Sequence, residues 1–202
     1  MSSEERREQL LSSGVALLAG RSHREVSIED IAAAAGVSKG LLYHYFPTKR
    51  DFILAALERG QRRLAEQLRP DPRLDAEAQL DRSLEAFLDY VEEHRAAYMA
   101  IFREGGGDPE IGAALGAGRA EQMAMLIDAL EGWEGSPVSA QPSPALETAI
   151  MGWLFFVEGA VLRWLERGDL DRDRLRLLLR TALGGALYAA RTAGQPPPDS
   201  GA

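Results

Sequence analysis

The sequence of 202 residues predicts an all-α protein of about nine helices. Along nearly the whole chain, apolar residues recur three and four positions apart, which is the spacing of a helix with one buried face. No stretch alternates apolar and polar residues as a half-buried strand does, and no internal repeat of roughly 20 to 50 residues indicates a repeat architecture. The apolar share of 46% is enough for a globular core.

Composition limits the classes of protein to consider. Without cysteine, the chain forms no disulfide and offers no thiolate for catalysis or metal binding. The charged start MSSEERREQ lacks the apolar segment of a signal peptide, and no run of ~18 uncharged apolar residues predicts a membrane span. We therefore expect a cytoplasmic protein.

The first helix is expected over residues 4–19, with Gly20 as its end. Its apolar stripe consists of Leu10, Leu11, Val15 and Leu18. We expect it to cover the short helices that follow, because two short helices cannot bury a core alone.

Residues 27–52 predict a helix, a tight turn, a short helix and the start of a longer helix. Ser27 begins the first of these as an N-cap, because an acidic residue follows three positions later. Gly36 ends it, since glycine adopts the left-handed cap conformation at little cost. Ser38 can cap the second helix, and Thr48 the third. Two helices joined by a short glycine-containing turn form a helix-turn-helix, whose second helix can enter the major groove of DNA.

The third of these helices is expected over residues 48–68 and completes a first domain of residues 1–69. The apolar residues expected to face inward from the three helices are Ile28, Ile31, Ala32, Ala35, Leu42, Phe46, Phe52, Ile53 and Leu57. The arginines toward its far end are expected to form a solvated flank: Arg59, Arg62, Arg63 and Arg69.

Five more helices are expected in a second domain, residues 70–194, after a boundary marked by two prolines. They cover residues 75–94, 96–103, 108–130, 145–167 and 171–191. Asp108 is expected to cap the third of them, with Pro109 at its first position, and Gly168 to end the fourth. A Gly/Ser/Pro-rich loop at 132–144 and a disordered Pro-rich tail at 195–202 complete the chain.

The last two helices carry more apolar surface than one subunit needs, and the first of them is apolar nearly all round. Pairing them with their copies in a second subunit would form a four-helix bundle and bury the excess. We therefore expect a homodimer through these two helices.

Two local features of the helix-turn-helix indicate a ligand with phosphates. Only two of the 23 basic residues are lysines, Lys39 and Lys49, and each falls in the first turn of a predicted helix. A cation is unfavourable there unless a phosphate docks, because the helix N-terminus already carries partial positive charge. Gly40 inside a helix costs about 1 kcal/mol against alanine, but it lets a ligand approach the backbone closely.

The stretch AGVSKGLLYHYFPTKRDF resembles the DNA-binding core of the TetR/AcrR family of transcriptional regulators. The match spans most motif positions of residues 27–52, whereas the remaining helices agree in layout only. The resemblance implies a homodimer with two such heads, a ligand pocket in the C-terminal half, and ligand binding that usually releases DNA. One departure precedes the motif: the family commonly has glycine and an aromatic residue in the turn where this chain has Arg21-Ser22-His23-Arg24.

The residues predicted to face DNA are Ser27, Ser38, Lys39, Gly40, Tyr43, His44, Tyr45 and Lys49. Lys39 is the candidate for a base-edge contact, because guanine acceptors lie within reach of the start of the second helix. Tyr43 and His44 can reach bases or phosphates, and the two serines offer hydroxyl or backbone N–H groups. The resemblance also places Tyr45 and Lys49 on phosphates.

The net charge of −8 argues against DNA binding only when the whole chain is counted. Residues 1–69 hold 11 basic against 9 acidic residues, a balance of +2, and the remainder holds 12 against 22, a balance of −10. The acidity is therefore confined to the part that need not touch DNA. We expect modest non-specific affinity that falls steeply with salt.

The effector pocket is predicted in the second domain, lined by large apolar side chains that suit a small, largely apolar ligand. The candidates are Phe87, Tyr90, Tyr98, Met99, Phe102, Met123, Trp153, Phe156 and Glu158, of which the apolar members are also candidates for plain core. Glu158 lies in an apolar run and needs a partner, which is either Arg103, Arg163 or a cationic ligand.

The leading hypothesis is a ligand-responsive repressor that binds a palindromic operator as a dimer. An activator or a ligand-independent regulator of the same fold is the alternative, and an enzyme is a remote one. The triple glycine at 105–107 lacks the Gly-Lys-Ser/Thr of a phosphate loop, and no nucleophile–base constellation is present. The three histidines lie far apart in sequence, so neither a metal site nor a cofactor is expected.

Overall fold

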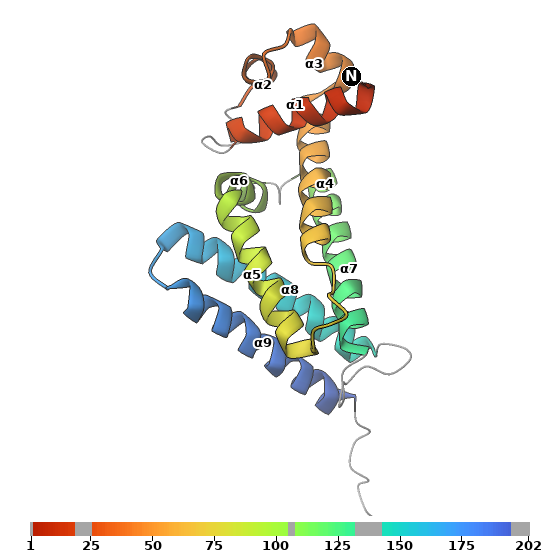
Figure 1. The fold of residues 1–202 in the computed structure, drawn as a ribbon, viewed down its shortest axis with the longest axis vertical. Coiled ribbons are helices and arrows are strands. Elements are labelled where there is room, and N and C mark those ends of the chain that lie inside the picture. Colours follow the sequence, from red (N-terminus) through yellow and green to blue (C-terminus); the bar gives the residue numbers. More distant parts are fainter. Residues whose placement is uncertain (1, 19–25, 105–107, 132–142, 195–202) are drawn as a thin grey trace, which may run out of the picture. The chain divides into compact units, whose positions relative to one another are not determined.

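The computed structural model describes residues 2–18, 26–104, 108–131 and 143–194, and within these ranges it contains nine α-helices and no strand (Figure 1). The helices are α1 Ser3–Leu18, α2 Ile28–Ala34, α3 Lys39–Tyr45, α4 Lys49–Gln67, α5 Ala76–Glu93, α6 Arg95–Glu104, α7 Pro109–Glu131, α8 Pro144–Arg167 and α9 Arg172–Ala193. The predicted all-α class is confirmed, and the predicted ends agree within two residues.

The chain divides into two compact units, each with its own core. Unit 1 comprises Met1–Glu66 and Asp89–Gly116, and unit 2 comprises Gln67–Leu88 and Ala117–Ala202. The units are not consecutive stretches of sequence, because the division falls inside α5 and inside α7.

The helix starts in unit 1 follow local capping chemistry. The Ser27 hydroxyl accepts a hydrogen bond from the backbone N–H of Asp30 at 3.1 Å, and the Asp30 carboxylate accepts one from the backbone N–H of Ser27 at 2.9 Å. This capping box starts α2 as predicted. Thr48 and Asp51 form the same reciprocal arrangement before α4, at 3.1 and 2.8 Å. Between α2 and α3, Gly36 has a φ of +63°, a conformation that favours glycine.

The core of the first three helices consists of small and medium apolar side chains closed by two phenylalanines. Its buried members are Leu10, Leu11, Val26, Ile28, Ile31, Ala32, Leu42, Phe46, Phe52 and Ala55. Phe46 and Phe52 meet edge to face with ring centroids 5.1 Å apart, the geometry that aromatic quadrupoles prefer. The inward-facing residues predicted for the helix-turn-helix are confirmed, except that Ala35 is only partly buried against this core.

A second, smaller cluster in unit 1 joins α4 to the first turns of α7. Ile53 and Leu57 of α4 pack with Ile111 and Leu115 of α7. Asp108 caps α7 ahead of Pro109, as predicted, by accepting hydrogen bonds from two backbone N–H groups of its first turn at 3.0 and 3.4 Å.

One prediction for α4 is wrong. Arg59, expected on a solvated flank, is buried with 9% exposure, whereas Arg62, Arg63 and Arg69 are exposed. Its guanidinium lies 2.8 Å from the Glu8 carboxylate and donates to the Ser12 hydroxyl at 2.7 Å. Both partners belong to α1, so the cation is buried because tertiary packing supplies a carboxylate that helical periodicity alone does not reveal.

In unit 2, α8 and α9 lie side by side and form the principal contact (Figure 1). Trp153 of α8 is buried, and its indole N–H donates to the Leu179 carbonyl at 2.9 Å. Gly168 ends α8 with a φ of +62°, as predicted, and Asp171 caps α9 by accepting from the backbone N–H of Arg174. By length and composition alone α8 could cross a membrane, a test that core helices of soluble proteins also pass.

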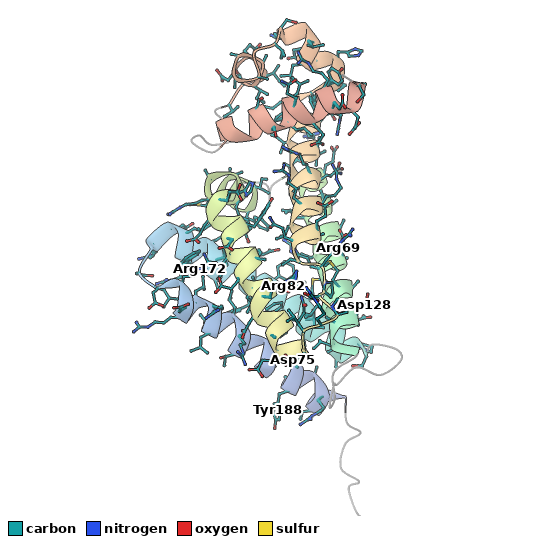
Figure 2. The ribbon with its side chains drawn as sticks, viewed as in Figure 1. Arg69, Asp75, Arg82, Asp128, Arg172 and Tyr188 are labelled. Atoms are coloured by element: carbon teal, nitrogen blue, oxygen red, sulfur yellow. The ribbon has the colours of Figure 1, made fainter. Side chains whose placement is uncertain are left out.

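Charged side chains connect α5 to its neighbours within unit 2. Arg82 donates to the carbonyls of Arg69 and Gln67 at 3.0 and 3.3 Å, and therefore caps the C-terminal end of α4, where carbonyls lack helical partners (Figure 2). Along α9, three arginines spaced by four positions pair with three acids of the same spacing on α5. Arg172 and Arg176 both pair with Glu85, and Arg180 pairs with Glu77 and Asp81.

Some predictions concern segments outside the residues that the structure describes. These are the end of the first helix at Gly20, the turn at 21–24, the glycines at 105–107, the loop at 132–142 and the tail at 195–202. For Val15, Leu18 and Arg103 the helix is described but the side chains are not.

Candidate nucleic-acid interface

The predicted interface lies on α2, α3 and the start of α4, all within unit 1. Leu42 and Phe46 are fully buried and fix the inner side of α3. The opposite side of this short helix is therefore held toward solvent, where Lys39, Gly40 and Tyr43 are exposed. We call the following seven residues, which are exposed except for the half-buried Ser27, the α2–α3 surface: Ser27, Glu29, Ser38, Lys39, Gly40, Tyr43 and His44.

The two serines of this surface serve as helix caps. The Ser38 hydroxyl accepts from the backbone N–H of Leu41 at 3.2 Å and starts α3, as predicted. Ser27 is half-buried and engaged in the capping box of α2. The Ser27 hydroxyl also donates to the Asp30 carboxylate at 2.7 Å, so both its proton and its oxygen are engaged within α2. The Ser38 oxygen is engaged as an acceptor, which leaves its hydroxyl proton for a ligand.

Lys39, predicted to meet bases, has two contacts inside the protein. Its ammonium forms an ion pair with the Glu29 carboxylate of α2 and lies 5.7 Å from the centre of the Tyr43 ring. The hydrogen bond from Lys39 lowers the pKa of Glu29, and the same bond raises the pKa of Lys39. Both side chains are more than half exposed, so water and salt screen the pair.

The aromatic residues of α3 divide into exposed and packed members. Tyr43 is 40% exposed, and His44 is exposed as well. Tyr45 is half-buried and packs on the core, while its ring meets that of His44 edge to face at 5.2 Å. Tyr43 and His44 are therefore more accessible to a ligand than Tyr45 is.

At the start of α4, Lys49 is half-buried and Arg50 is exposed. The Arg50 guanidinium lies 2.9 Å from the Asp108 carboxylate and 3.6 Å from that of Glu110. Burial opposes ionisation of Asp108, but backbone N–H groups of α7 and the Arg50 charge together hold its pKa below the usual value. Asp108 thus both caps α7 and ties it to the start of α4.

Glu29 and Arg50 were not among the predicted site residues. Glu29 pairs with Lys39 of the next helix, and Arg50 pairs with Asp108, which is distant in sequence. Helical spacing within one element indicates neither pair. The sequence places both residues in the first turn of a helix, next to predicted DNA contacts. That position is the feature from which a role at this site could have been predicted.

The predicted effector residues fall in both units. Tyr90, Tyr98, Met99 and Phe102 belong to unit 1. Phe87, Met123, Trp153, Phe156 and Glu158 belong to unit 2. Tyr98 and Trp153 are buried, whereas Phe156 is 41% exposed. Within unit 1, Tyr98 and Phe102 lie with ring centroids 4.3 Å apart, and burial raises the pKa of Tyr90.

The partner of Glu158 differs from the prediction. Arg163 pairs with Asp169 instead, and Glu158 accepts two hydrogen bonds from Arg119 of α7, at 2.6 and 2.9 Å. The Arg119 guanidinium also lies over the Phe155 ring at 4.5 Å. The Arg119–Glu158 pair connects α7 to α8. Arg163 lies near the C-terminal end of α8, where it pairs with Asp169 of the loop before α9.

Among the described residues, no group of three or more His, Asp or Glu side chains has an arrangement that could hold a metal ion. The polar chemistry of the α2–α3 surface instead consists of hydroxyls, an ammonium paired with a carboxylate, an imidazole and a phenol. The hydroxyls, the ammonium, the imidazole and the phenol are groups that bind phosphate oxygens and base edges.

Comparison with known proteins gives matches over both parts of the chain. Residues 10–56 match the model described as "Bacterial regulatory proteins, tetR family", and residues 76–183 match "Tetracyclin repressor-like, C-terminal domain". The Transcriptional regulator AcuR of Cereibacter sphaeroides is 32% identical, over 92% of this chain and 86% of AcuR. The HTH-type transcriptional activator FasR of Mycolicibacterium smegmatis is 35% identical over 49% of this chain, which spans 46% of FasR.

A solved structure agrees with these matches. The crystal structure of a tetR-family transcriptional regulator from Streptomyces coelicolor is 30% identical and has a TM-score of 0.83, over 96% of this chain and 85% of that one. The relatives found are transcriptional regulators, not enzymes. The chain therefore belongs to the TetR family of transcriptional regulators, with an N-terminal helix-turn-helix DNA-binding domain.

Proposed function

We propose that this protein is a cytoplasmic, ligand-responsive repressor that binds a palindromic operator as a homodimer and is released by a small, largely apolar effector. The observation that carries DNA binding is the exposed start of α3. Ser38, Lys39 and Gly40 are all exposed there, while Leu42 and Phe46 anchor the opposite side in the core. Phosphate oxygens suit the N–H groups of this helix start, and base edges suit Lys39 and Tyr43.

Exposed apolar side chains on α8 and α9 support the homodimer. Tyr188 is 66% exposed, Leu177 64% and Phe155 53%, and Figure 2 shows Tyr188 projecting from α9. We define the α8–α9 surface as the exposed large apolar residues and glycines of these helices: Gly152, Phe155, Phe156, Gly159, Leu177, Leu178, Gly184, Gly185 and Tyr188. So many exposed large apolar groups are typical of a surface that a partner covers.

The glycines of the α8–α9 surface support the same proposal. An added Cβ at Gly152, Gly159, Gly184 or Gly185 would meet no atom of the described chain within 4 Å. Each glycine inside a helix costs about 1 kcal/mol against alanine, and the subunit itself offers no steric reason for it. Close approach of helices from a second copy supplies that reason, because glycine lets two backbones pack more tightly.

A symmetric dimer determines the form of the DNA site. Two copies of α3 related by a twofold axis would read two inverted half-sites, so the operator should be a palindrome. The half-sites should be separated by about one helical turn of DNA, roughly 34–36 Å, or a multiple of it.

The effector is proposed to be small and largely apolar because the candidate lining residues are mainly aromatic or methionine. Glu158 does not require a cationic ligand, since Arg119 satisfies it with two hydrogen bonds. Compounds without a formal positive charge are therefore the first to test.

Activation is the second candidate. FasR, which shares 35% identity over 101 residues with this chain, is described as a transcriptional activator. A repressor and an activator can differ in where they bind relative to a promoter, while both use a helix-turn-helix domain.

The test uses the full chain with fragmented bacterial DNA and random duplexes. We expect enrichment of one palindromic sequence, bound as a dimer, and lower expression from a promoter that contains it. Higher expression from that promoter would favour the activator. Failure to enrich any sequence at low salt would overturn DNA binding. Release of the enriched duplex by a member of a library of apolar compounds tests the effector proposal separately.

A further inference from the structure

Two helix caps place opposite charges together on the α2–α3 surface. The capping box of Ser27 starts α2 so that Glu29 lies in its first turn, and Ser38 starts α3 so that Lys39 is its first residue. The buried residues Ile31 and Leu42 pack these two helices on the same core. The result is an ion pair between Glu29 and Lys39, with the Tyr43 ring beside the ammonium.

A carboxylate in this position opposes DNA binding. Glu29 is more than half exposed and lies against the cation proposed to meet DNA, so phosphates would repel it. Lys39 must also exchange the Glu29 carboxylate for a DNA oxygen when it binds. The capping box of α2 uses Asp30, so that box does not require Glu29.

We propose that Glu29 is a specificity-determining residue, which weakens binding to non-cognate DNA more than it weakens binding to the operator. The proposal rests on the DNA-binding function proposed above. It names Glu29 as the acid that competes with phosphates for Lys39, and thereby sets the ratio between operator and non-specific affinity.

The physical reason lies in the different partners that the two kinds of DNA offer. Non-cognate DNA is bound through contacts between cations and phosphates, so neutralisation of Lys39 by Glu29 removes one such contact. At the operator, a guanine offers acceptors to Lys39, and the amino group of its paired cytosine is a donor to a carboxylate. Lys39 and Glu29 lie side by side and present a donor and an acceptor, which a guanine–cytosine pair can satisfy together. At the operator, these two contacts offset the repulsion between Glu29 and the phosphates, whereas other sequences leave that repulsion in place.

The experiment measures the full-length wild type and the Glu29→Gln variant on two duplexes. One is the duplex that wild type enriches from a random library, and the other is a scrambled duplex of equal length and composition. We expect Glu29→Gln to bind the scrambled duplex about threefold to tenfold more tightly and to lower the ratio of the two affinities by at least threefold. The salt dependence on the scrambled duplex should steepen by about 0.9 in log–log slope, because Lys39 then releases one more counterion.

Two further variants separate this role from a change in net charge. Glu58→Gln removes the same charge from an exposed position of α4 and should leave the affinity ratio within twofold of wild type. In a Lys39→Gln background, Glu29→Gln should no longer steepen the salt slope. The inference is overturned if Glu29→Gln tightens both duplexes equally, leaves both unchanged, or raises the ratio. If wild type enriches no duplex at all, it is the DNA-binding function that has failed.

Discussion

The α2–α3 surface and the α8–α9 surface both lie over well-filled cores, yet they expose opposite chemistry. The first presents hydroxyls, an ion pair, a phenol and an imidazole above the buried residues Ile31, Leu42 and Phe46. The second presents two phenylalanines, two leucines, a tyrosine and four glycines above buried residues such as Val161 and Leu179. The difference therefore does not come from poor packing of either unit.

The contrast separates two kinds of partner. A polar surface with a lysine at a helix start suits nucleic acid and remains stable in water when DNA is absent. An apolar surface of the second kind is unfavourable in water and suits permanent burial against protein. We therefore expect DNA to bind reversibly at α3, and the proposed partner subunit to remain bound at α8 and α9.

The largest effect is expected beneath the α8–α9 surface. Trp153→Ala should lower the free energy of unfolding by about 3–5 kcal/mol, because it removes a buried aromatic side chain and its hydrogen bond to the Leu179 carbonyl. Urea denaturation at one fixed protein concentration measures this loss. Trp164→Ala is the matched control, since Trp164 is half-buried and makes the equivalent bond to the Leu170 carbonyl. An equal or greater loss in the control would contradict the special role of Trp153.

Changing the apolar surface itself should break the dimer while each subunit still folds. Leu178→Glu should weaken self-association by about 100-fold or more, because two unpaired carboxylates would be buried in each dimer. Sedimentation velocity across a concentration series measures the dissociation constant. Leu74→Glu makes the same change at an exposed leucine between α4 and α5 and should leave the dimer intact. A dimer unaffected by Leu178→Glu would exclude this part of α9 from the interface.

The sequence was most informative where structure depends on near neighbours. The caps at Ser27, Ser38, Thr48 and Asp171 each involve residues within three positions, so the helix starts could be predicted from local chemistry. The inward-facing apolar residues of the helix-turn-helix could be predicted from helical spacing in the same way.

Ion pairs between distant elements could not be predicted in this way. Glu158 pairs with Arg119, 39 positions away, and Arg59 of α4 pairs with Glu8 of α1. Periodicity identifies which face of a helix is buried, but the chemistry opposite that face depends on tertiary packing. For this reason Arg59 was wrongly expected on the surface and Arg163 was wrongly considered as a partner of Glu158.

On the polar surface, Lys39→Ala should affect some base pairs and not others. Loss of a base-edge contact should cost about 1–3 kcal/mol at the base pair that Lys39 meets and relax the preference there. Binding to a library of single-base operator variants measures the preference at each position. An unchanged preference at every position would refute a base contact by Lys39.

Lys49→Ala should instead weaken binding to all sequences by a similar factor. A contact from Lys49 to phosphate carries no sequence information, so its loss should reduce the salt slope by about one and leave the base preferences intact. Titrations of one operator and one scrambled duplex at several salt concentrations test both statements. A loss confined to the operator would show that Lys49 reads bases.

The smallest effect concerns protonation of the α2–α3 surface. The hydrogen bond from Lys39 lowers the pKa of Glu29, so the ion pair should be fully formed above the usual glutamate pKa of about 4.3 and be lost as the pH falls through the lowered value. Carboxyl NMR titration of the full chain should therefore show Glu29 titrating below that value. In Lys39→Met its pKa should rise toward the usual value, while that of Asp108, whose partner is Arg50, should not move. If the pKa of Glu29 were the same in both proteins, Lys39 would not be its partner in solution, and Lys39 would face DNA without the competition from Glu29 proposed above.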